Sequence, residues 1–297
     1  MPRLNGFTKK QILVVYKKMV LARKLDKKML TMLKQGKSYF HMGSSGHEAA
    51  QLAAADVIRP GQDWIFPYYR DAALCIGLGM TSREHLLSFL ARADDPNSGG
   101  RQMPHHYSHK DLRIVSQSSS TGTQFLQAVG CAMARKIEKT KEIVYVSAGE
   151  GTTSQGDYHE ALNWASLVKA PVIFHIQDNG YAISTHKSEQ ISSSVFTMAS
   201  GYKNLVRYEV NGTDFFETNL AFKQAVERGR RGKGPSLVVS NVVRLLSHSS
   251  SDDHRKYRSR EDLDEDRNRD PITILENQCT KNNFISSKDF EKIENEI

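Results

Sequence analysis

The stretch EIVYVSAGEGTTSQGDYHEALNWASLVKAPVIFHIQDNG, residues 142–180, decides the fold. It begins with a β-rich apolar run, continues with a helical pattern over 156–168, and ends with a second apolar run over 171–176. Strand, helix and strand in this order form a βαβ unit, whose parallel strands are buried on both faces. The same order of strand, helix and strand recurs later in the sequence, so we expect an α/β fold with a doubly wound, mostly parallel sheet flanked by helices. The second set of segments is 205–210, 215–230 and 236–243.

Helical patterns surround this unit on both sides. Thr8 and Gln11 form a capping-box signature, and apolar residues at helical spacing follow as far as a stop at Gly36. Long loops are expected between residues 95 and 117, and two short helices after Arg244. Three further helices are predicted, at 48–58, 84–91 and 122–138.

The composition is that of an ordinary soluble globular protein, with 39% apolar and 25% charged residues in a chain of 297. No apolar stretch reaches the roughly 18 residues of a membrane span, and the first residues lack an apolar signal core. The three scattered cysteines, Cys75, Cys131 and Cys279, are typical of reduced thiols. These features predict a cytoplasmic protein with no membrane partner.

The net charge of +8 is concentrated at the N-terminus, where residues 1–39 carry eleven Lys or Arg and a single acid, Asp26. A basic helix can bind nucleic acid or another anionic surface. The lysines fall mostly opposite the apolar stripe, and no aromatic residues lie between them to stack on bases. We therefore favour a solvated helix face and expect no nucleic-acid partner.

The glycine-rich turn after the first apolar run contains Glu150, which would repel a phosphate. A dinucleotide fingerprint is a poor match, because Gly149 and Gly151 are followed by Gly156, five residues on instead of three. Asn179 follows the next strand, and the carboxyl ends of parallel strands share one edge of a sheet. Carboxylate and amide oxygens suit Mg²⁺, which can also hold phosphate oxygens. The alternative is an ordinary acidic turn followed by an Asx turn.

The same residues carry a family resemblance. GEG followed 26 residues later by DN resembles the thiamin-diphosphate motif, and the longer string from Gly149 to Thr185 resembles the alpha subunit of the decarboxylating first component of 2-oxo acid dehydrogenase complexes. The resemblance covers nearly the whole chain. It implies a single thiamin-diphosphate-binding domain over 1–297, with a basic N-terminal helix in 1–40 and an active-site loop and helical tail in 244–297.

The resemblance also implies which residues bind the cofactor. The Mg²⁺ ligands would be Glu150, Asn179 and the backbone carbonyl of Tyr181. The diphosphate would be bound by Tyr69, Arg70, Gly151, Thr152 and Arg244, since arginine suits phosphate oxygens. The aminopyrimidine ring would be bound by Ser119 and Thr121. A potassium ion would be bound by Ser118, Thr123 and Gln124, although Ser-Thr-Gly stands at 120–122 where relatives have Pro-Leu-Ala.

The segment RLLSHSSSDDHRKYR, residues 244–258, resembles the family's active-site loop. His248 corresponds to a catalytic and cofactor-binding histidine that moves protons. Ser249 corresponds to a serine that is phosphorylated in animal enzymes. Two positions depart from the family pattern: Gln177 stands where an arginine is frequent near the diphosphate, and Ser247 replaces a frequent second histidine.

A histidine cluster in the loop GRQMPHHYSH could suggest zinc. His105, His106 and His109 lack a second set of ligands nearby, and the loop resembles the family's GRQMPxHY segment. We therefore interpret them as structural residues or as part of a substrate channel.

The implied reaction is oxidative decarboxylation of a 2-oxo acid, with transfer of the acyl group to a lipoyl arm of the acyltransferase core. The resemblance places the activating glutamate on a beta subunit, separate or fused, so an α2β2 assembly is expected. The segment GRQMP and the SDD…YR arrangement favour a branched-chain substrate such as 2-oxoisovalerate. Pyruvate and acetoin dehydrogenases are the nearer alternatives, and a catalytically dead binding protein is the more distant one.

Overall fold

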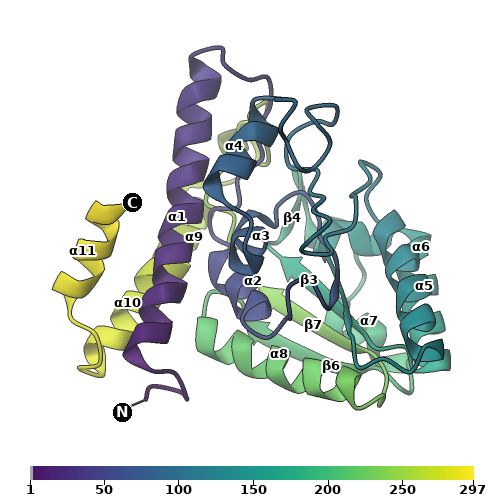
Figure 1. The fold of residues 1–297 in the computed structure, drawn as a ribbon. Helices are drawn as coiled ribbons and strands as arrows, with labels where there is room; N and C mark the ends of the chain where they lie inside the picture. The colour runs from purple at the N-terminus through teal and green to yellow at the C-terminus, as the bar shows by residue number, and fades with distance from the viewer. Residues whose placement is uncertain (1–2) are drawn as a thin grey trace.

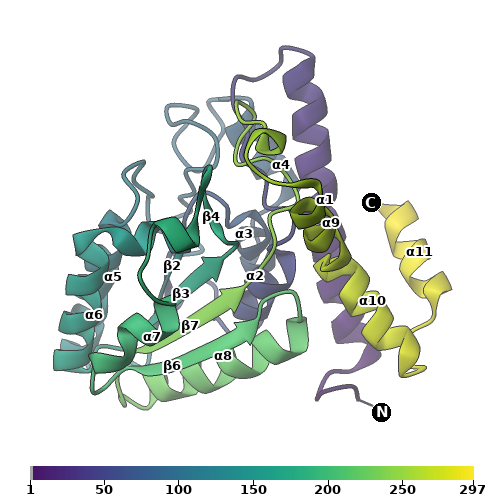
Figure 2. The ribbon, with the colours of Figure 1, turned by 180° about the vertical axis from the view of Figure 1, so that it is seen from behind.

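A five-stranded sheet lies at the centre of the computed structural model, which describes residues 3–297 (Figures 1 and 2). Every neighbouring pair of its strands is parallel. A short antiparallel ribbon of β4 (Tyr181–Ala182) and β5 (Thr185–His186) lies outside it. The doubly wound α/β class predicted from the sequence is confirmed. In spatial order the strands are β1 (Trp64–Phe66), β2 (Val144–Gly149), β3 (Val172–Asp178), β7 (Ser236–Asn241) and β6 (Val206–Asn211).

Helices cover both faces of the sheet and separate the core into two apolar clusters. The face with α2 (Glu48–Ala55), α3 (Ala72–Leu78) and α8 (Phe215–Arg230) buries Tyr145 and Val238, whereas the face with α5 (Thr123–Ile137) and α6 (Gly156–Val168) buries Val144, Val146 and Val239. Successive strand residues therefore point to opposite clusters. Because both faces are buried, the strands are continuous apolar runs, as expected for a parallel sheet.

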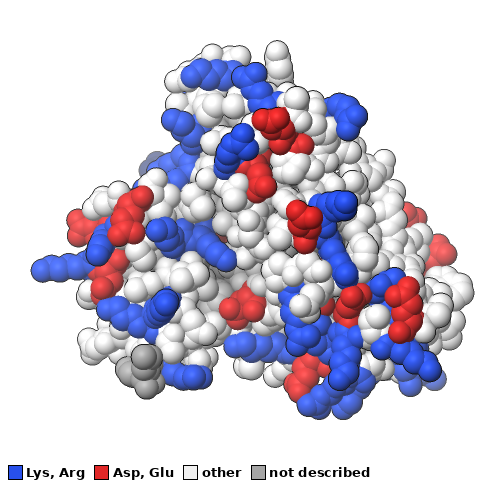
Figure 3. Space-filling model, in the orientation of Figure 1, with Lys and Arg blue, Asp and Glu red and all other residues white. Residues whose placement is uncertain are grey.

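The basic N-terminal helix α1 (Lys9–Lys34) packs beside the C-terminal helices, a proximity that both ribbon views show (Figures 1 and 2). Its predicted capping box is present, with Gln11 N donating to Thr8 Oγ1 and Thr8 N donating to Gln11 Oε1. Part of its positive charge pairs with the C-terminal helix, because Lys9 lies 2.8 Å from Asp289. Figure 3 shows carboxylates interspersed with Lys and Arg on one face of the molecule.

The remaining helices are short. They are α4 (Ser82–Phe89), α7 (Val195–Met198), α9 (Arg260–Asn268), α10 (Pro271–Lys281) and α11 (Ser287–Glu296). Of the helices in residues 3–297, none is long and apolar enough to cross a membrane.

Several elements differ from those predicted. The prediction omitted β1 and α3, and it gave two helices after Arg244 where the structure has three. β1 has only three residues, and α3 (AALCIGL) is buried on nearly every side, so it shows no apolar–polar periodicity. The helix predicted over 48–58 ends at Ala55. The loop over 95–117 contains no regular helix or strand, as predicted.

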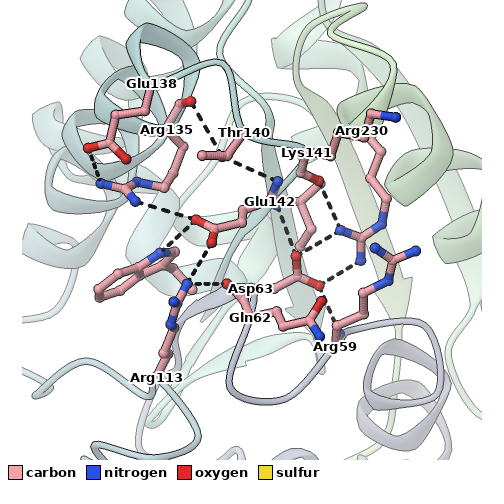
Figure 4. A network of polar contacts seen from close by, with 12 residues as sticks. Arg59, Gln62, Asp63, Arg113, Arg135, Glu138, Thr140, Lys141, Glu142 and Arg230 are labelled. Atoms are coloured by element: carbon pink, nitrogen blue, oxygen red, sulfur yellow. Dashed lines mark hydrogen bonds and ion pairs between the residues drawn. The ribbon is translucent and has the colours of Figure 1, made fainter.

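The amino ends of the strands are closed by a buried charged network around Asp63 (Figure 4). The Asp63 carboxylate accepts hydrogen bonds from Ile143 N (3.0 Å) and Arg59 N (2.8 Å), and it pairs with Arg230 of α8 at 2.6 Å. The network fixes β1 and α8 against the start of β2. The opposite edge, where the strands end, is the usual location of a ligand in this fold class.

Candidate active site

A cavity of about 250 Å³ lies at the carboxyl ends of β2 and β3. We call it the strand-end cavity. The β2–β3 register places Gly149 opposite Gln177, so the turns that follow the two strands meet at one edge of the sheet. The lining residues are Tyr68, Tyr69, Arg70, Thr121, Gly149, Glu150, Gly151, Thr152, Asn179, Tyr181, Ala182, Ile183 and His248. The structure therefore brings together nine of the residues predicted from the sequence.

Glu150 is a buried carboxylate with an incomplete set of partners. Its Oε2 accepts a hydrogen bond from Asn179 N at 3.2 Å, while Oε1 has no partner among the described residues. Burial, together with the nearby charge of Asp178, raises the pKa of Glu150 to about 7. A buried oxygen that lacks a donor, in a place where negative charge is unfavourable, suits a cation.

Asn179 and Tyr181 complete an oxygen donor set at the same place. Asn179 Oδ1 accepts from Tyr181 N at 3.2 Å and retains a second lone pair. Together with the Tyr181 carbonyl and Glu150, these are the hard ligands that Mg²⁺ prefers, and a cation this small leaves coordination positions for water or phosphate. The residues present therefore fit the predicted magnesium ion.

The glycine of the turn after β2 is required by close packing. A Cβ atom on Gly151 would lie 2.6 Å from the Cβ of Ala182, closer than real side chains approach. The Gly151 carbonyl accepts from Gln190 Nε2 at 2.6 Å, which fixes the turn from the other side. Gly151 and Thr152 therefore present backbone, and not a bulky side chain, to the cavity.

Two buried arginines supply unbalanced positive charge. Arg70 is 2% exposed and Arg244 is 1% exposed. Among the described residues, the guanidinium of Arg70 donates only to the Gly43 carbonyl and to His248, and that of Arg244 only to the Ile183 carbonyl and the Tyr257 hydroxyl. These partners carry no formal charge when His248 is neutral. Burial lowers the pKa of Arg244, and the charge of Arg70 lowers it further.

Burying a charge without a counter-charge is unfavourable, so this arrangement favours an anionic ligand. A phosphate group matches the planar fork of donors on a guanidinium. Arg244 does not line the strand-end cavity itself, but the carbonyl to which it donates belongs to Ile183, which does. A ligand with diphosphate and a divalent cation would balance both signs of charge.

His248 lies half-buried on the cavity wall beside Arg70. Its Nδ1 is 3.3 Å from the guanidinium of Arg70, and its backbone N donates to Asp252 at 2.8 Å. Because a guanidinium only donates, Nδ1 must accept, and the neutral ring carries its proton on Nε2. Burial lowers the pKa of His248 to about 4, and the positive charges of Arg70 and Arg244 add to the effect.

Ser249 points away from the strand-end cavity. It is 9% exposed, and its hydroxyl lies 3.0 Å from that of Ser251. It lines a separate cavity of about 190 Å³ on the other side of the loop, together with Ser247. Phosphorylation of Ser249, which stays a prediction, would require this loop to open.

The residues predicted to bind the ring and potassium are only partly assembled. Thr121 lines the strand-end cavity, whereas Ser119 does not, and its hydroxyl lies 2.7 Å from His106 Nε2. Of the three predicted potassium ligands, Ser118 and Thr123 form hydrogen bonds with the Ser120 backbone in the same loop, whereas Gln124 donates to the Ser147 carbonyl. Potassium binding stays a prediction.

The three loop histidines have separate partners. His105 lies beside His41 at 3.0 Å, His106 beside Ser119, and His109 beside Glu84 at 3.4 Å. Over residues 3–297, no group of three or more His, Cys, Asp or Glu side chains is arranged to hold a metal ion.

A buried polar network beneath the cavity was not predicted. Gln177 donates from Nε2 to Asp71 at 2.6 Å, and its Oε1 lies 2.8 Å from His47 and 2.9 Å from Gln51. Burial raises the pKa of Asp71 to about 7. Gln177 is thus directed into the interior and does not line the cavity. The only signal in the sequence was a polar residue in the apolar run PVIFHIQD.

Comparison with known proteins identifies the family. Residues 16–297 match the family described as Dehydrogenase E1 component. The chain is 40% identical over 284 residues to 2-oxoisovalerate dehydrogenase subunit alpha of Bacillus subtilis, covering 95% of this chain and 86% of that protein. It is 34% identical over 278 residues to the mitochondrial subunit of the same name from Caenorhabditis elegans, covering 93% of this chain and 64% of the relative.

A relative with a different name also matches over most of its length. The pyruvate dehydrogenase E1 component subunit alpha of Acholeplasma laidlawii is 31% identical over 290 residues, which cover 97% of this chain and 81% of that protein. The resemblance inferred from the sequence is confirmed by the family match over 16–297 and by the bacterial relative at 40% identity, and the chain belongs to the dehydrogenase E1 component family.

Proposed function

We propose that this chain is the alpha half of an enzyme that oxidatively decarboxylates a branched-chain 2-oxo acid and transfers the acyl group to a lipoyl arm of an acyltransferase core. Membership of the E1 family implies a thiamin-diphosphate-dependent 2-oxo acid dehydrogenase with a beta-subunit partner. The observation that carries the proposal is the unpartnered Glu150 oxygen in the strand-end cavity, which Arg70 also lines and behind which Arg244 donates to the Ile183 carbonyl. Neither arginine has a charged hydrogen-bond partner among the described residues.

The roles of the binding residues follow from their charges. Glu150, Asn179 and the Tyr181 carbonyl would hold Mg²⁺, and Arg70 and Arg244 would hold the diphosphate with Tyr69 and the backbone of Gly151 and Thr152. When bound, thiamin diphosphate supplies a carbon nucleophile and an electron sink for the decarboxylation. Thr121, which lines the cavity, would lie against its ring, and Ser119, whose hydroxyl lies 2.7 Å from His106, would meet the ring mainly through its backbone. A catalytically dead protein would have no need of these buried charged groups.

His248 is the residue that would move protons. Its neutral ring presents Nε2–H as a donor, and its depressed pKa reflects burial first and then the nearby arginines. An anion that offsets those charges should raise the pKa of His248 toward the usual value of about 6.5, where a histidine exchanges protons readily near neutral pH.

A beta subunit would complete the site. Glu150 is the only carboxylate among the described residues that line the strand-end cavity, and it is already assigned to the metal. The glutamate that activates the cofactor in this family would therefore come from the partner, in an α2β2 assembly. Pyruvate is the second candidate substrate, because a pyruvate dehydrogenase alpha subunit is 31% identical to this chain.

The substrate is tested by coexpression with a beta subunit of the family and assays with thiamin diphosphate and Mg²⁺. We expect kcat/KM for 2-oxoisovalerate to exceed that for pyruvate by at least about tenfold, because methylene-scale contacts discriminate by this order. A preference for pyruvate or acetoin would replace the substrate assignment. A folded α/β complex that turns over none of the three would refute the enzyme function.

Glu150→Ala should abolish Mg²⁺-dependent binding of thiamin diphosphate, with a loss of at least about 100-fold in affinity, because the variant lacks the one acidic ligand of the site. The fold should persist, since Glu150 has an unpartnered buried oxygen whose removal relieves a cost. Calorimetric titration and circular dichroism measure the two effects. Glu160→Ala, which removes an exposed glutamate on α6, is the matched control and should bind normally. Normal binding by Glu150→Ala would refute the metal assignment.

The pH behaviour of His248 can be measured by NMR on the full chain, with His248→Asn to assign the signal. Without cofactor we expect its pKa to lie near the value of about 4 that burial and the arginines impose. Because the unfolded histidine titrates near 6.5, the unfolded state binds the proton first, and acidification from about pH 6.5 to 4 should destabilise the fold through this residue. Titration near 6.5 in the cofactor-free chain would contradict the proposed environment.

A further inference from the structure

Four buried polar side chains lie in a row behind the loop that carries His248. They are Asp26, His41, His105 and Tyr107, with exposed fractions of 3%, 1%, 5% and 2%. His41 Nε2 lies 3.3 Å from Asp26 Oδ1, His41 Nδ1 lies 3.0 Å from His105 Nε2, and His105 Nδ1 lies 3.3 Å from the Tyr107 hydroxyl. Neither histidine lines the strand-end cavity, so neither belongs to the binding site described above.

Asp26 sets the direction in which hydrogen bonds are donated along this row. Its Oδ2 accepts from Ser44 N (2.8 Å), Ser45 N (2.9 Å) and Ser45 Oγ (2.7 Å). Burial alone would raise the pKa of Asp26, but the neighbouring His41 ring and hydrogen bonds from Ser45 and Ser44 hold it below the usual value. An ionised carboxylate can only accept hydrogen bonds. His41 Nε2 faces this carboxylate at an ion-pair distance of 3.3 Å without hydrogen-bond geometry, and a ring proton on Nε2 avoids opposing two lone pairs.

The positions of the other protons in the row follow from the proton on His41 Nε2. A His41 ring with its single proton on Nε2 accepts at Nδ1, and His105 then donates from Nε2. His105 Nδ1 is then an acceptor, and the Tyr107 hydroxyl donates to it. We propose that Tyr107, His105 and His41 form a one-directional hydrogen-bond chain that ends beside the Asp26 carboxylate and positions the loop bearing His248.

The connection to the loop runs through the backbone of His41. Its N–H donates to Ser250 Oγ at 3.1 Å, and its carbonyl accepts from Ser250 N at 2.8 Å. Two residues further on, the Gly43 carbonyl accepts from Arg70 at 2.5 Å. Leu245 N donates to the Ser45 carbonyl at 3.2 Å. The segment 41–45 is thus held by Asp26 on one side and holds two points of the loop on the other.

Residues 43–46 pack closely against the residues that lead into the loop. A Cβ atom on Gly43 would lie 2.5 Å from Leu246 Cδ1, and one on Gly46 would lie 2.1 Å from the Val243 carbonyl oxygen. His105 adopts φ +69, in the left-handed region that is strained for a non-glycine residue. Such strain persists where the surroundings fix the residue, as its two ring partners do here. His41 and His105 are therefore positioning residues that act through the loop.

The first test is the tautomeric state of the two histidines in the full-length wild-type chain at neutral pH. Nitrogen-15 NMR should find both His41 and His105 neutral and protonated on Nε2. A proton on Nδ1 of either ring, or a doubly protonated ring, would overturn the direction of the chain. This measurement needs neither cofactor nor substrate, so its outcome does not depend on the proposed function. Only the role of the loop in catalysis rests on that function.

The second test compares His105→Leu with His105→Gln by hydrogen exchange of the Ser250 amide. Leucine leaves His41 Nδ1 without a donor, and we expect exchange to accelerate about tenfold. Glutamine can donate to His41 and accept from Tyr107, so the exchange rate of the Ser250 amide in His105→Gln should stay within about threefold of wild type. Both variants carry the same strain at φ +69, which removes backbone conformation as the cause.

His175→Leu is the matched control for the loss of a buried histidine. His175 is equally buried and lies 2.7 Å from the Tyr145 hydroxyl and 2.9 Å from Ser240, but it belongs to β3 and does not contact the loop. In His175→Leu the hydrogen-exchange rate of the Ser250 amide should match that of the wild type. Equal acceleration in His175→Leu, or equally fast exchange in His105→Gln and His105→Leu, would refute the positioning role. Should the leucine variant not fold, Tyr107→Phe removes only the terminal donor, and unchanged Ser250 exchange there would count against the chain.

Discussion

The uncompensated charge at the ends of β2 and β3 is the constraint on which the site depends. Arg70 and Arg244 are buried with only uncharged hydrogen-bond partners among the described residues, and Glu150 is buried nearby with one oxygen unpartnered. Each of these groups alone is unfavourable in a protein interior. A metal ion and a diphosphate bound together supply the missing charge of both signs. The fold thus carries strain that a ligand relieves.

The parallel sheet determines where these charges meet. Because β2 and β3 are neighbours in register, Glu150 and Asn179 follow the two strands at the same edge. Gly151 then allows the two turns to approach closely, since any side chain there would collide with Ala182. At the other edge the ion pair of Asp63 and Arg230 closes the sheet. The buried carboxylate at that edge therefore has its counter-charge within the fold, whereas the charges at the strand ends are left for a ligand.

The features that could be predicted from the sequence are those that depend on local residue patterns and on the order of elements along the chain. Alternating strands and helices gave the parallel sheet, and the βαβ order alone was enough to bring Glu150 and Asn179 together. It could not predict the direction of Gln177, because every residue of β3 is buried and a strand pattern does not tell which polar side chain faces a neighbour. The partnership of His41 with His105 joins residues 64 positions apart through a loop without regular structure, and no periodicity encodes it.

The central claim is that metal and diphosphate complete the site together. The most direct measurement is the thermal denaturation midpoint of the full chain with Mg²⁺ alone, with inorganic pyrophosphate alone, and with both. Because each ligand offsets the charge that opposes the other, the account predicts that the pair raises the midpoint by more than the sum of the separate shifts. Shifts that merely add, or no shift with both ligands present, would contradict it.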